Sequence, residues 1–298
     1  MLSILIPERN YNCTKLVKDV AEQCEKAGIV FEIIVMDNAS TLCKDENRTI
    51  STIPGCRFVE SEQNMGLAKS RNSLVQLAQF AHFLMIDSDA EIVNNDNYIQ
   101  NYIEAMNLAQ VVVGSMCYTS QKPSSSRCLR WYYGNNRENR PAAVRNQNPY
   151  KSLITFNLMM EKELVLQYPF EEQKGYGHDD SIMGSTLKQN GITVLHIDNP
   201  IIHNGLDSSK DFLIKSLDAV EKYFTYPVFQ SDEMLEQIKV FRVFKKVQSL
   251  GLCRLLAFKF RAARKLMEWN LCSSHPSIFL YDFYRLSYMC DFSLKHQF

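Results

Sequence analysis

The sequence predicts an α/β protein with a mixed, mainly parallel sheet flanked by helices and a helical C-terminal extension. Short apolar runs rich in β-branched residues alternate with segments of helical periodicity up to about residue 205. Strand followed by helix at this spacing is typical of parallel βαβ units. Beyond Asp207 the pattern is helical, without a clear strand. We therefore expect one domain over residues 1–206 and a basic, helical extension over residues 207–298.

The expected elements follow one another closely along the chain. Strands are predicted from compact apolar runs at residues 2–7, 31–36, 56–60, 82–86, 109–116, 152–160, 192–196 and 200–203. Helices are predicted from apolar residues three or four positions apart at residues 14–27, 67–81, 98–108, 161–167 and 179–189. Residues 120–149 are polar, rich in Arg and Asn and contain prolines, so we expect a long surface excursion there.

The composition is that of a globular protein. Of the 298 residues 46% are apolar and 22% charged, which excludes disordered and fibrous classes. The 33 Lys and Arg residues balance 33 Asp and Glu residues, so the basic excess of a nucleic-acid binder is absent. The balance is uneven, because residues 239–298 carry eleven Lys and Arg against three Asp and Glu.

The cysteines and the chain start indicate a cytoplasmic protein. Nine scattered cysteines without a CxxC pair indicate reduced thiols rather than a zinc framework or a secreted disulfide scaffold. The apolar run at the N-terminus stops at Glu8, which is too short for a signal peptide. No window is long and apolar enough for a membrane-spanning helix, so we expect neither a targeting segment nor a span.

The sharpest motif is the triplet Asp87-Ser88-Asp89, which follows an apolar run. Side chains two positions apart on an extended chain point the same way, so both carboxylates can face one point. Adjacent carboxylates repel each other unless a cation lies between them, and hard oxygen ligands suit Mg²⁺ or Mn²⁺ holding a diphosphate. A turn stabilised by the aspartate side chains is the simpler alternative.

Two further segments could face the same edge of the sheet. Gly66 stands just before a predicted helix, where backbone amides can approach an anion, and Arg71 lies about one turn into that helix. His203 ends an apolar run and could complete a metal site begun by Asp89. The simpler alternatives are a turn with a solvated arginine and a partly buried histidine without a ligand.

Asp179 and Asp180 begin a predicted helix after the glycine-rich turn at residues 175–177. Carboxylates are favoured at helix N-termini, so capping explains either residue without any catalytic role. A carboxylate there can also act as a general base if it reaches an acceptor hydroxyl.

Taken in order, these segments resemble the family 2 glycosyltransferases of the GT-A fold, the nucleotide-sugar-dependent kind found in bacterial polysaccharide synthesis. The resemblance covers about residues 1–205 and is carried by SILIPERN, EIIVMDNAS, NMGLAKSRN, the DSD triplet as a DXD motif, GYGHDDS and HNG. It implies an inverting hexosyltransferase that moves a sugar from a nucleotide diphosphate, usually UDP, to a hydroxyl of a glycan or lipid-linked acceptor. It also implies Mn²⁺ or Mg²⁺ as cofactor.

The resemblance also implies roles for individual positions. The donor nucleotide would be bound by Pro7, Glu8, Arg9, Asp37, Asn64, Gly66, Arg71, Asp87 and Ser88. Asp37 would bond the base, and the metal would be held by Asp89 as the direct ligand with His203 and Asp87. Asp179 falls where such enzymes keep the catalytic base, and Asp180 competes for that role.

Two departures from the family pattern keep other functions open. The chain reads Asp37-Asn38 where many relatives carry two aspartates, and His178-Asp179 where a Glu-Asp pair is usual. The alternatives are a non-catalytic nucleotide-sugar-binding protein and a metal-dependent phosphohydrolase, the latter prompted by His178-Asp179. A nicotinamide dehydrogenase is disfavoured because no GxGxxG follows the first strand.

The C-terminal part has a pattern of its own, because residues 239–270 interleave apolar side chains with nine Lys and Arg. A basic amphipathic segment of this kind can lie on an anionic membrane. That would place the protein peripherally on the inner face of the plasma membrane, beside a lipid-linked acceptor. The alternative is a helical cap packed on the first domain or on a partner subunit.

Overall fold

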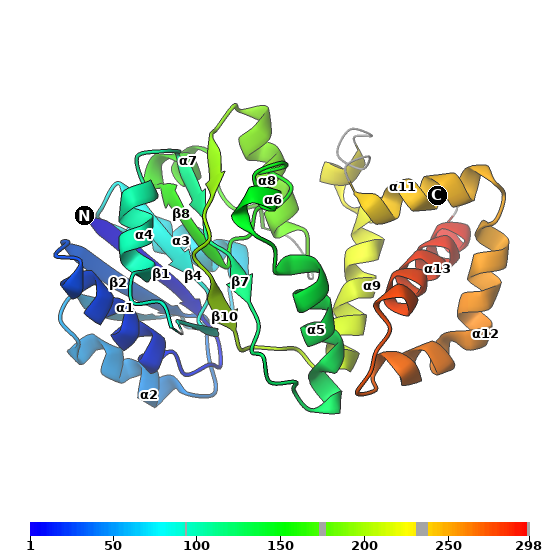
Figure 1. Ribbon diagram of the computed structural model, residues 1–298, viewed down its shortest axis with the longest axis horizontal. Helices are drawn as coiled ribbons and strands as arrows, with labels where there is room; N and C mark the ends of the chain where they lie inside the picture. The colour runs from blue at the N-terminus through cyan, green and yellow to red at the C-terminus, as the bar shows by residue number, and fades with distance from the viewer. Residues whose placement is uncertain (93, 173–176, 231–237, 297–298) are drawn as a thin grey trace. The chain divides into compact units, whose positions relative to one another are not determined.

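The computed structural model describes residues 1–92, 94–172, 177–230 and 238–296 and divides into two compact units (Figure 1). The first unit comprises Met1–Thr119, Asn139–Gln173 and Asp179–Gly205. The second comprises Ser120–Glu138, Lys174–His178 and Leu206–Phe298. The second unit is therefore assembled from segments that lie far apart in the sequence.

Four parallel strands form one half of the sheet in the first unit. They are β1 (Leu2–Glu8), β2 (Phe31–Asp37), β3 (Cys56–Glu60) and β4 (His82–Ile86), in the order β3-β2-β1-β4. β1 is buried along its whole length, as expected for a central parallel strand covered on both faces. The carboxyl ends of these four strands lie at one edge.

Three further strands complete the seven-stranded sheet and make it mixed. β8 (Asn157–Glu161) is antiparallel to both β4 and β6 (Val111–Val113), and β9 (Val194–His196) is parallel to β6. The predicted fold class, a mixed and mainly parallel sheet flanked by helices, is confirmed. A small second sheet in the order β5-β10-β7 joins β5 (Ala90–Glu91), β10 (Ile201–His203) and β7 (Met116–Cys117).

Helices cover the large sheet on both faces. On one face α3 (Leu67–Leu77), α7 (Lys162–Gln167) and α8 (Asp179–Gln189) bury Leu74, Val75, Leu164, Met183 and Leu187 against alternate strand residues such as Leu5, Ile34, Met85 and Leu158. On the other face α1 (Thr14–Lys26) packs against β2 and against α4 (Tyr98–Ala105). The alternation of strand side chains between two buried faces explains why these runs are uniformly apolar.

The helix predicted over residues 67–81 ends earlier, at Leu77, because the next residues bond elsewhere. Gln79 donates its backbone N–H to Glu32 Oε1 at 2.6 Å, and Phe80 donates to Ser3 Oγ at 3.2 Å. These strand side chains replace the helical carbonyls as partners and turn the chain toward β4. The strand predicted over residues 109–116 is likewise divided into β6 and β7, with Gly114 and Ser115 between them.

The expectation of a long surface excursion over residues 120–149 is wrong. The segment forms a 3-10 turn (Ser125–Arg127), α5 (Cys128–Tyr133), a π-helical stretch (Gly134–Glu138) and α6 (Ala142–Arg145). Leu129 is fully buried, and the buried Arg145 donates to the carbonyls of Gly114 at 2.9 Å and Ile197 at 2.7 Å. The prediction failed because polar side chains in this segment satisfy backbone groups inside the protein.

The second unit is helical, as the sequence predicts beyond Asp207. It contains α5, α9 (Ser209–Thr225), α11 (Lys239–Ser249), α12 (Cys253–Leu271) and α13 (Ile278–His296). The remaining short helix α2 (Lys44–Arg48) is part of the first unit. Leu129, Phe212, Phe260, Met267, Tyr281 and Tyr284 meet in its core. Within the part of the chain that the structure describes, no helix combines the length and the apolar character needed to cross a bilayer. All nine cysteines are free thiols.

Candidate active site

Carboxylates stand in a row at the carboxyl ends of the parallel strands. In the register of the sheet Glu8 is paired with Asp37, and Asp37 with Glu60. Open α/β sheets bind their ligands outside this edge, so these side chains mark where a ligand site is expected.

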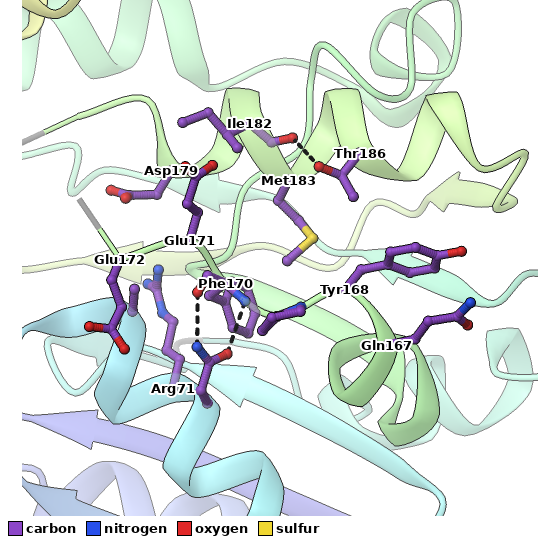
Figure 2. A pocket seen from close by; sticks show the side chains of 13 residues that line it. Arg71, Gln167, Tyr168, Phe170, Glu171, Glu172, Asp179, Ile182, Met183 and Thr186 are labelled. Carbon is purple, nitrogen blue, oxygen red and sulfur yellow. Dashed lines mark hydrogen bonds between the residues drawn. The ribbon is translucent and has the colours of Figure 1, made fainter. Parts of the chain in front are cut away.

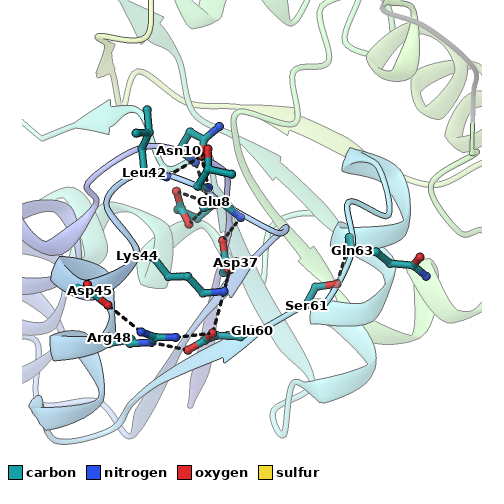
Figure 3. Close-up of polar contacts among 12 residues, drawn as sticks. Glu8, Asn10, Asp37, Leu42, Lys44, Asp45, Arg48, Glu60, Ser61 and Gln63 are labelled. Carbon is teal, nitrogen blue, oxygen red and sulfur yellow. Dashed lines mark hydrogen bonds and ion pairs between the residues drawn. The ribbon is translucent and has the colours of Figure 1, made fainter.

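Asp37 is fully buried, and its charge is balanced by a lysine from α2 (Figure 3). Ser40 donates its backbone N–H to Asp37 Oδ1 at 2.8 Å, and Lys44 Nζ lies 3.3 Å from Oδ2. Oδ2 is buried, and among the described residues Lys44 is its ionic partner.

Glu60 connects Lys44 to a second cation of α2. Lys44 Nζ lies 2.9 Å from Glu60 Oε2, and Arg48 Nε donates to Oε1 at 2.7 Å. The hydrogen bonds from Arg48 and then Lys44 lower the pKa of Glu60 to about 2. The sequence analysis missed both cations. Their only signal was a mixed-charge pentapeptide, KDENR, which is equally typical of a solvated surface helix.

Glu8 and Asn10 bind neighbouring loop backbone. The buried Glu8 accepts a hydrogen bond from the Tyr11 N–H at 2.7 Å and from Ser40 Oγ at 3.1 Å, and burial raises its pKa. Asn10 Oδ1 accepts from the N–H groups of Thr41 and Leu42. Of the three predicted nucleotide contacts at this strand end, Pro7 and Glu8 are buried and Arg9 is exposed.

The segment before α3 is held by two asparagines. Asn38 Oδ1 accepts the Met65 N–H at 2.8 Å, which gives a structural role to the residue that departs from the family pattern. The exposed Asn64 uses its Oδ1 to accept the Gly66 N–H at 3.0 Å. Gly66 has a φ of +84°, a conformation that favours glycine, and no side chain caps α3. The Gly66 amide, expected near an anion, is therefore already engaged.

Arg71 and Asp87 form an ion pair at the carboxyl end of β4. The Arg71 side chain is 4% exposed, and its Nη2 lies 2.9 Å and 3.2 Å from the two Asp87 oxygens. Burial raises the pKa of Asp87, while Arg71 acts to lower it and the charge of Asp89 acts to raise it.

The small sheet brings His203 against Asp89. Pairing of β10 with β5 places His203 opposite Ala90, and His203 Nε2 lies 3.1 Å from Asp89 Oδ2. The imidazole packs against the ring of Phe156, with ring centroids 5.0 Å apart. A Cβ on Gly205 would overlap the Asp89 carboxylate, so glycine is required there for this close approach. Two residues more than a hundred positions apart, suspected from sequence, thus lie together.

The donor atoms at this point fit a divalent cation. Asp89 and His203 offer a carboxylate oxygen and an imidazole nitrogen side by side, and Asp87 adds negative charge behind them. Carboxylate oxygens suit both Mn²⁺ and Mg²⁺ as ligands. An imidazole nitrogen suits Mn²⁺ better than Mg²⁺. Among the residues that the structure describes, no three His, Cys, Asp or Glu side chains are arranged as a ready cluster.

Asp179 and Asp180 have different surroundings although they are adjacent on α8. Asp180 Oδ1 accepts hydrogen bonds from the Thr155 N–H at 3.0 Å and from Thr155 Oγ1 at 2.7 Å. Burial raises the pKa of Asp180, and Arg71 and Thr155 oppose that rise. Asp179 instead lines a cavity (Figure 2). Of the two candidates, Asp179 is the one placed to meet a ligand.

The cavity beside Asp179 measures about 490 Å³ and lies between α3, α8 and the segment after α7. Arg71, Tyr168, Phe170, Glu171, Glu172 and Met183 are among its lining residues. Asn72 holds this segment by two hydrogen bonds with the Phe170 backbone, at 2.8 Å and 2.9 Å. The sequence analysis missed these residues, because a YPFEE run carries no motif that distinguishes a cavity wall from a loop.

His178 is a packing residue of the helical unit. Its Nε2 lies 2.7 Å from the carbonyl oxygen of Ala219, and its ring contacts those of Tyr223 and Phe229. Burial lowers its pKa to about 4, so the imidazole is neutral at pH 7. The histidine that prompted the phosphohydrolase alternative thus has a structural use. Residues 175 and 176 of the glycine-rich turn lie outside the described residues.

Comparison with solved structures shows the same fold. A mannosyltransferase from Pyrobaculum calidifontis, PcManGT, in complex with GDP-Man and Mn²⁺, matches with a TM-score of 0.57 and 14% identity, covering 100% of this chain and 87% of its own. S. aureus TarS 1–349 in complex with UDP-GlcNAc matches with a TM-score of 0.50 and 15% identity, over 99% and 92% of the two chains.

Glucosyl-3-phosphoglycerate synthase from Mycobacterium tuberculosis, in complex with Mn²⁺, UDP and glucosyl-3-phosphoglycerate, matches with a TM-score of 0.50 and 18% identity, over 75% and 78% of the two chains. Against a longer S. aureus TarS structure, with a TM-score of 0.49 and 16% identity over 74% of this chain, the chain spans 39% of the relative's length. No curated protein matches the chain. At these identities the likeness establishes the GT-A fold.

The family comparison goes further than the fold. The model of "Glycosyl transferase family 2" matches residues 3–165, which is more than half of the chain. The matched region includes β1 to β4, α3 and the Asp87-Ser88-Asp89 triplet. The chain therefore belongs to glycosyl transferase family 2 and is a glycosyltransferase.

Proposed function

We propose that this glycosyltransferase moves a sugar from a nucleotide-diphosphate sugar to a hydroxyl group of a glycan or lipid-linked acceptor, with inversion at the anomeric carbon. The observation that carries the proposal is the approach of His203 to Asp89 beside the Arg71–Asp87 ion pair. Neighbours of the same fold were crystallised with GDP-Man and Mn²⁺ and with UDP-GlcNAc, which supports a nucleotide-sugar donor.

The donor would lie along the carboxyl edge of the parallel strands. Asp37 would accept a hydrogen bond from the base, and Arg9 and Asn64 are exposed polar residues of the same proposed donor site. Lys44, 3.3 Å from Asp37 Oδ2, would hold this side chain in place. Ser88, between the two aspartates, would lie with Asp87 near the ribose and diphosphate.

Asp89 and His203 would hold a divalent cation, with Asp87 contributing charge. Such an ion offsets the negative charge of a diphosphate leaving group. Arg71 holds both oxygens of Asp87 and so fixes the direction of that carboxylate.

Asp179 would act as the general base. Its carboxylate would take the proton of the acceptor hydroxyl while the new bond to the anomeric carbon forms and the bond to the diphosphate oxygen breaks. The cavity that Asp179 lines would receive the acceptor, and Tyr168 and Phe170 supply aromatic surface there. A single displacement from the face opposite the diphosphate inverts the configuration.

A nucleotide-release assay tests the proposal. The purified chain is incubated with Mn²⁺, a panel of UDP-, GDP- and other nucleotide sugars and a panel of glycan and lipid-linked acceptors, and both nucleotide release and saturation binding are recorded. We expect release that is selective for one sugar nucleotide. Binding without release would support the non-catalytic alternative, and release from any nucleotide diphosphate would support the phosphohydrolase.

A further inference from the structure

The helix α12 has two apolar faces. Its inner face buries Phe260, Met267 and Leu271 in the core of the helical unit, where they meet Tyr281 and Tyr284. Its outer face carries large apolar side chains that are exposed to solvent: Leu255 by 49%, Phe258 by 67%, Leu266 by 68% and Trp269 by 73%. We call these four side chains the outer stripe.

The outer stripe is continuous along the helix. Counted from Leu255 its members stand at positions i, i+3, i+11 and i+14, with Ala262 at i+7. At about 100° per residue these positions fall within roughly 80° of one another, on the side opposite the buried residues. Soluble monomers rarely expose a contiguous apolar set of this kind without a use for it.

Positive charge flanks the outer stripe on both sides. Lys259 lies along one border, and Arg254 and Lys265 lie along the other, and all three are exposed. The only carboxylate from residue 239 to residue 271 is Glu268, which is bonded to Arg264 and to the Tyr284 hydroxyl, each at 2.8 Å. The outer stripe is therefore bordered by cations, and the one carboxylate of its helix, Glu268, is bonded to Arg264 and Tyr284.

The turn before α12 also carries exposed apolar side chains next to lysines. Leu250 and Leu252 are exposed by 61% and 40%, and Lys245 and Lys246 precede them at the end of α11. Figure 1 shows α11 leading through this turn into α12. Apolar and cationic side chains thus continue beyond a single helix.

We propose that the outer stripe of α12 is a membrane-binding surface that lies on an anionic lipid bilayer. Apolar side chains would enter the acyl boundary, Trp269 would lie at headgroup depth, and the flanking lysines and arginines would bind lipid phosphates. Charge complementarity favours this occupant over a second copy of the chain, which would bring like charges face to face. The proposal concerns binding alone and does not depend on the donor site.

Vesicle flotation tests the proposal with the full-length chain. We expect flotation with vesicles of phosphatidylcholine and phosphatidylglycerol and little with phosphatidylcholine alone, and a decline as salt is raised. Phe258→Ser with Trp269→Ser should lower the partition coefficient about tenfold or more. Lys259→Gln with Lys265→Gln should lower it about 30-fold, at roughly fivefold per lysine.

Two controls separate the outer stripe from general effects. Leu108→Ser removes an equally exposed apolar side chain, at 71%, from the first unit and should leave binding unchanged. Asp89→Asn should also leave binding unchanged, so failure of the sugar-transfer proposal would not affect this one.

Fluorescence gives an independent measurement, because Trp131 and Trp269 are the two tryptophans of the chain. In a Trp131→Phe background the emission of Trp269 should shift to the blue with anionic vesicles. Absence of flotation, equal binding to neutral vesicles, or full binding by the Phe258 and Trp269 variant would overturn the proposal. If the wild-type chain self-associates without binding vesicles, and the Phe258 and Trp269 variant does not self-associate, the outer stripe binds a second copy of the chain and not a membrane.

Discussion

Two groups of carboxylates at the same sheet edge are neutralised in different ways. At the ends of β2 and β3, Asp37 and Glu60 are met by two cations, Lys44 and Arg48, through contacts of 2.7–3.3 Å. At the end of β4 the only cation bonded to Asp87 among the described residues is Arg71. Among the described residues two cations meet the first group, whereas one arginine meets the second.

The shortage of positive charge at the second group is visible in Arg71. Burial acts to lower its pKa, but the charges of Asp87, Asp180 and Asp179 outweigh burial and raise it. The Arg71 guanidinium thus interacts electrostatically with three carboxylates and is hydrogen-bonded to Asp87. The comparison supports our proposal that a divalent cation supplies further positive charge beside Asp87 and Asp89, whereas Lys44 and Arg48 supply it at the first group.

The largest effect is expected from Asp179→Asn. The amide keeps the shape of the side chain but cannot accept the proton of the acceptor, so kcat should fall about 10²–10⁴-fold with donor affinity retained. Steady-state kinetics and donor binding measure the two quantities. The matched variant Asp180→Asn should cost stability more than rate, because Asp180 is bonded to Thr155. Equal losses of kcat in both variants would refute the distinction.

Asp89→Asn tests the proposal that a divalent cation binds at Asp89. Loss of its charge should lower the transfer rate about 10²–10³-fold and abolish stabilisation by Mn²⁺ in thermal unfolding. The metal-dependent shift in Tm can be measured without any substrate. An Mn²⁺-dependent shift as large as that of the wild type would place the ion elsewhere.

Acid unfolding separates a buried histidine from the carboxylate groups. The pKa of His178 is lowered to about 4, so the unfolded chain takes up a proton below its usual pKa of about 6.5 while the folded chain does not. Stability is therefore full above about pH 6.5 and falls until about pH 4. In His178→Gln the free energy of unfolding should fall by about 2–3 kcal/mol less between about pH 6.5 and pH 4 than in the wild type, as measured by urea unfolding at several pH values. The exposed His275→Gln serves as its control, and an identical slope in both would count against the assignment.

Arg48→Gln addresses the balanced group and should have the smallest effect. Arg48 is half exposed, and exposed ion pairs add little to stability. Lys44 remains to meet both Asp37 and Glu60. We expect a change in Tm within about 2 °C and an unaltered transfer rate. A loss of rate comparable with that of Asp89→Asn would mean that both groups serve the reaction.

The sequence predicted the strand ends well because buried parallel strands are uniformly apolar and end at polar residues. The α/β class, the extents of β3, β4 and α8, and the nearness of His203 to Asp89 follow from local patterns and ordered motifs. The structure of residues 120–149 and of the cavity wall around Phe170 could not be predicted from local patterns. It depends on tertiary partners such as Asn72 and the carbonyls that Arg145 binds. The choice between Asp179 and Asp180 likewise required knowing where Thr155 lies.

Titration calorimetry of nucleotide sugars, with and without Mn²⁺, tests the central claim most directly. The account predicts that at least one UDP- or GDP-linked sugar binds the wild-type chain, and that omission of Mn²⁺ or the change Asp89→Asn weakens this binding about tenfold or more. Binding that is indifferent to both changes, or no binding by any nucleotide sugar, would contradict it.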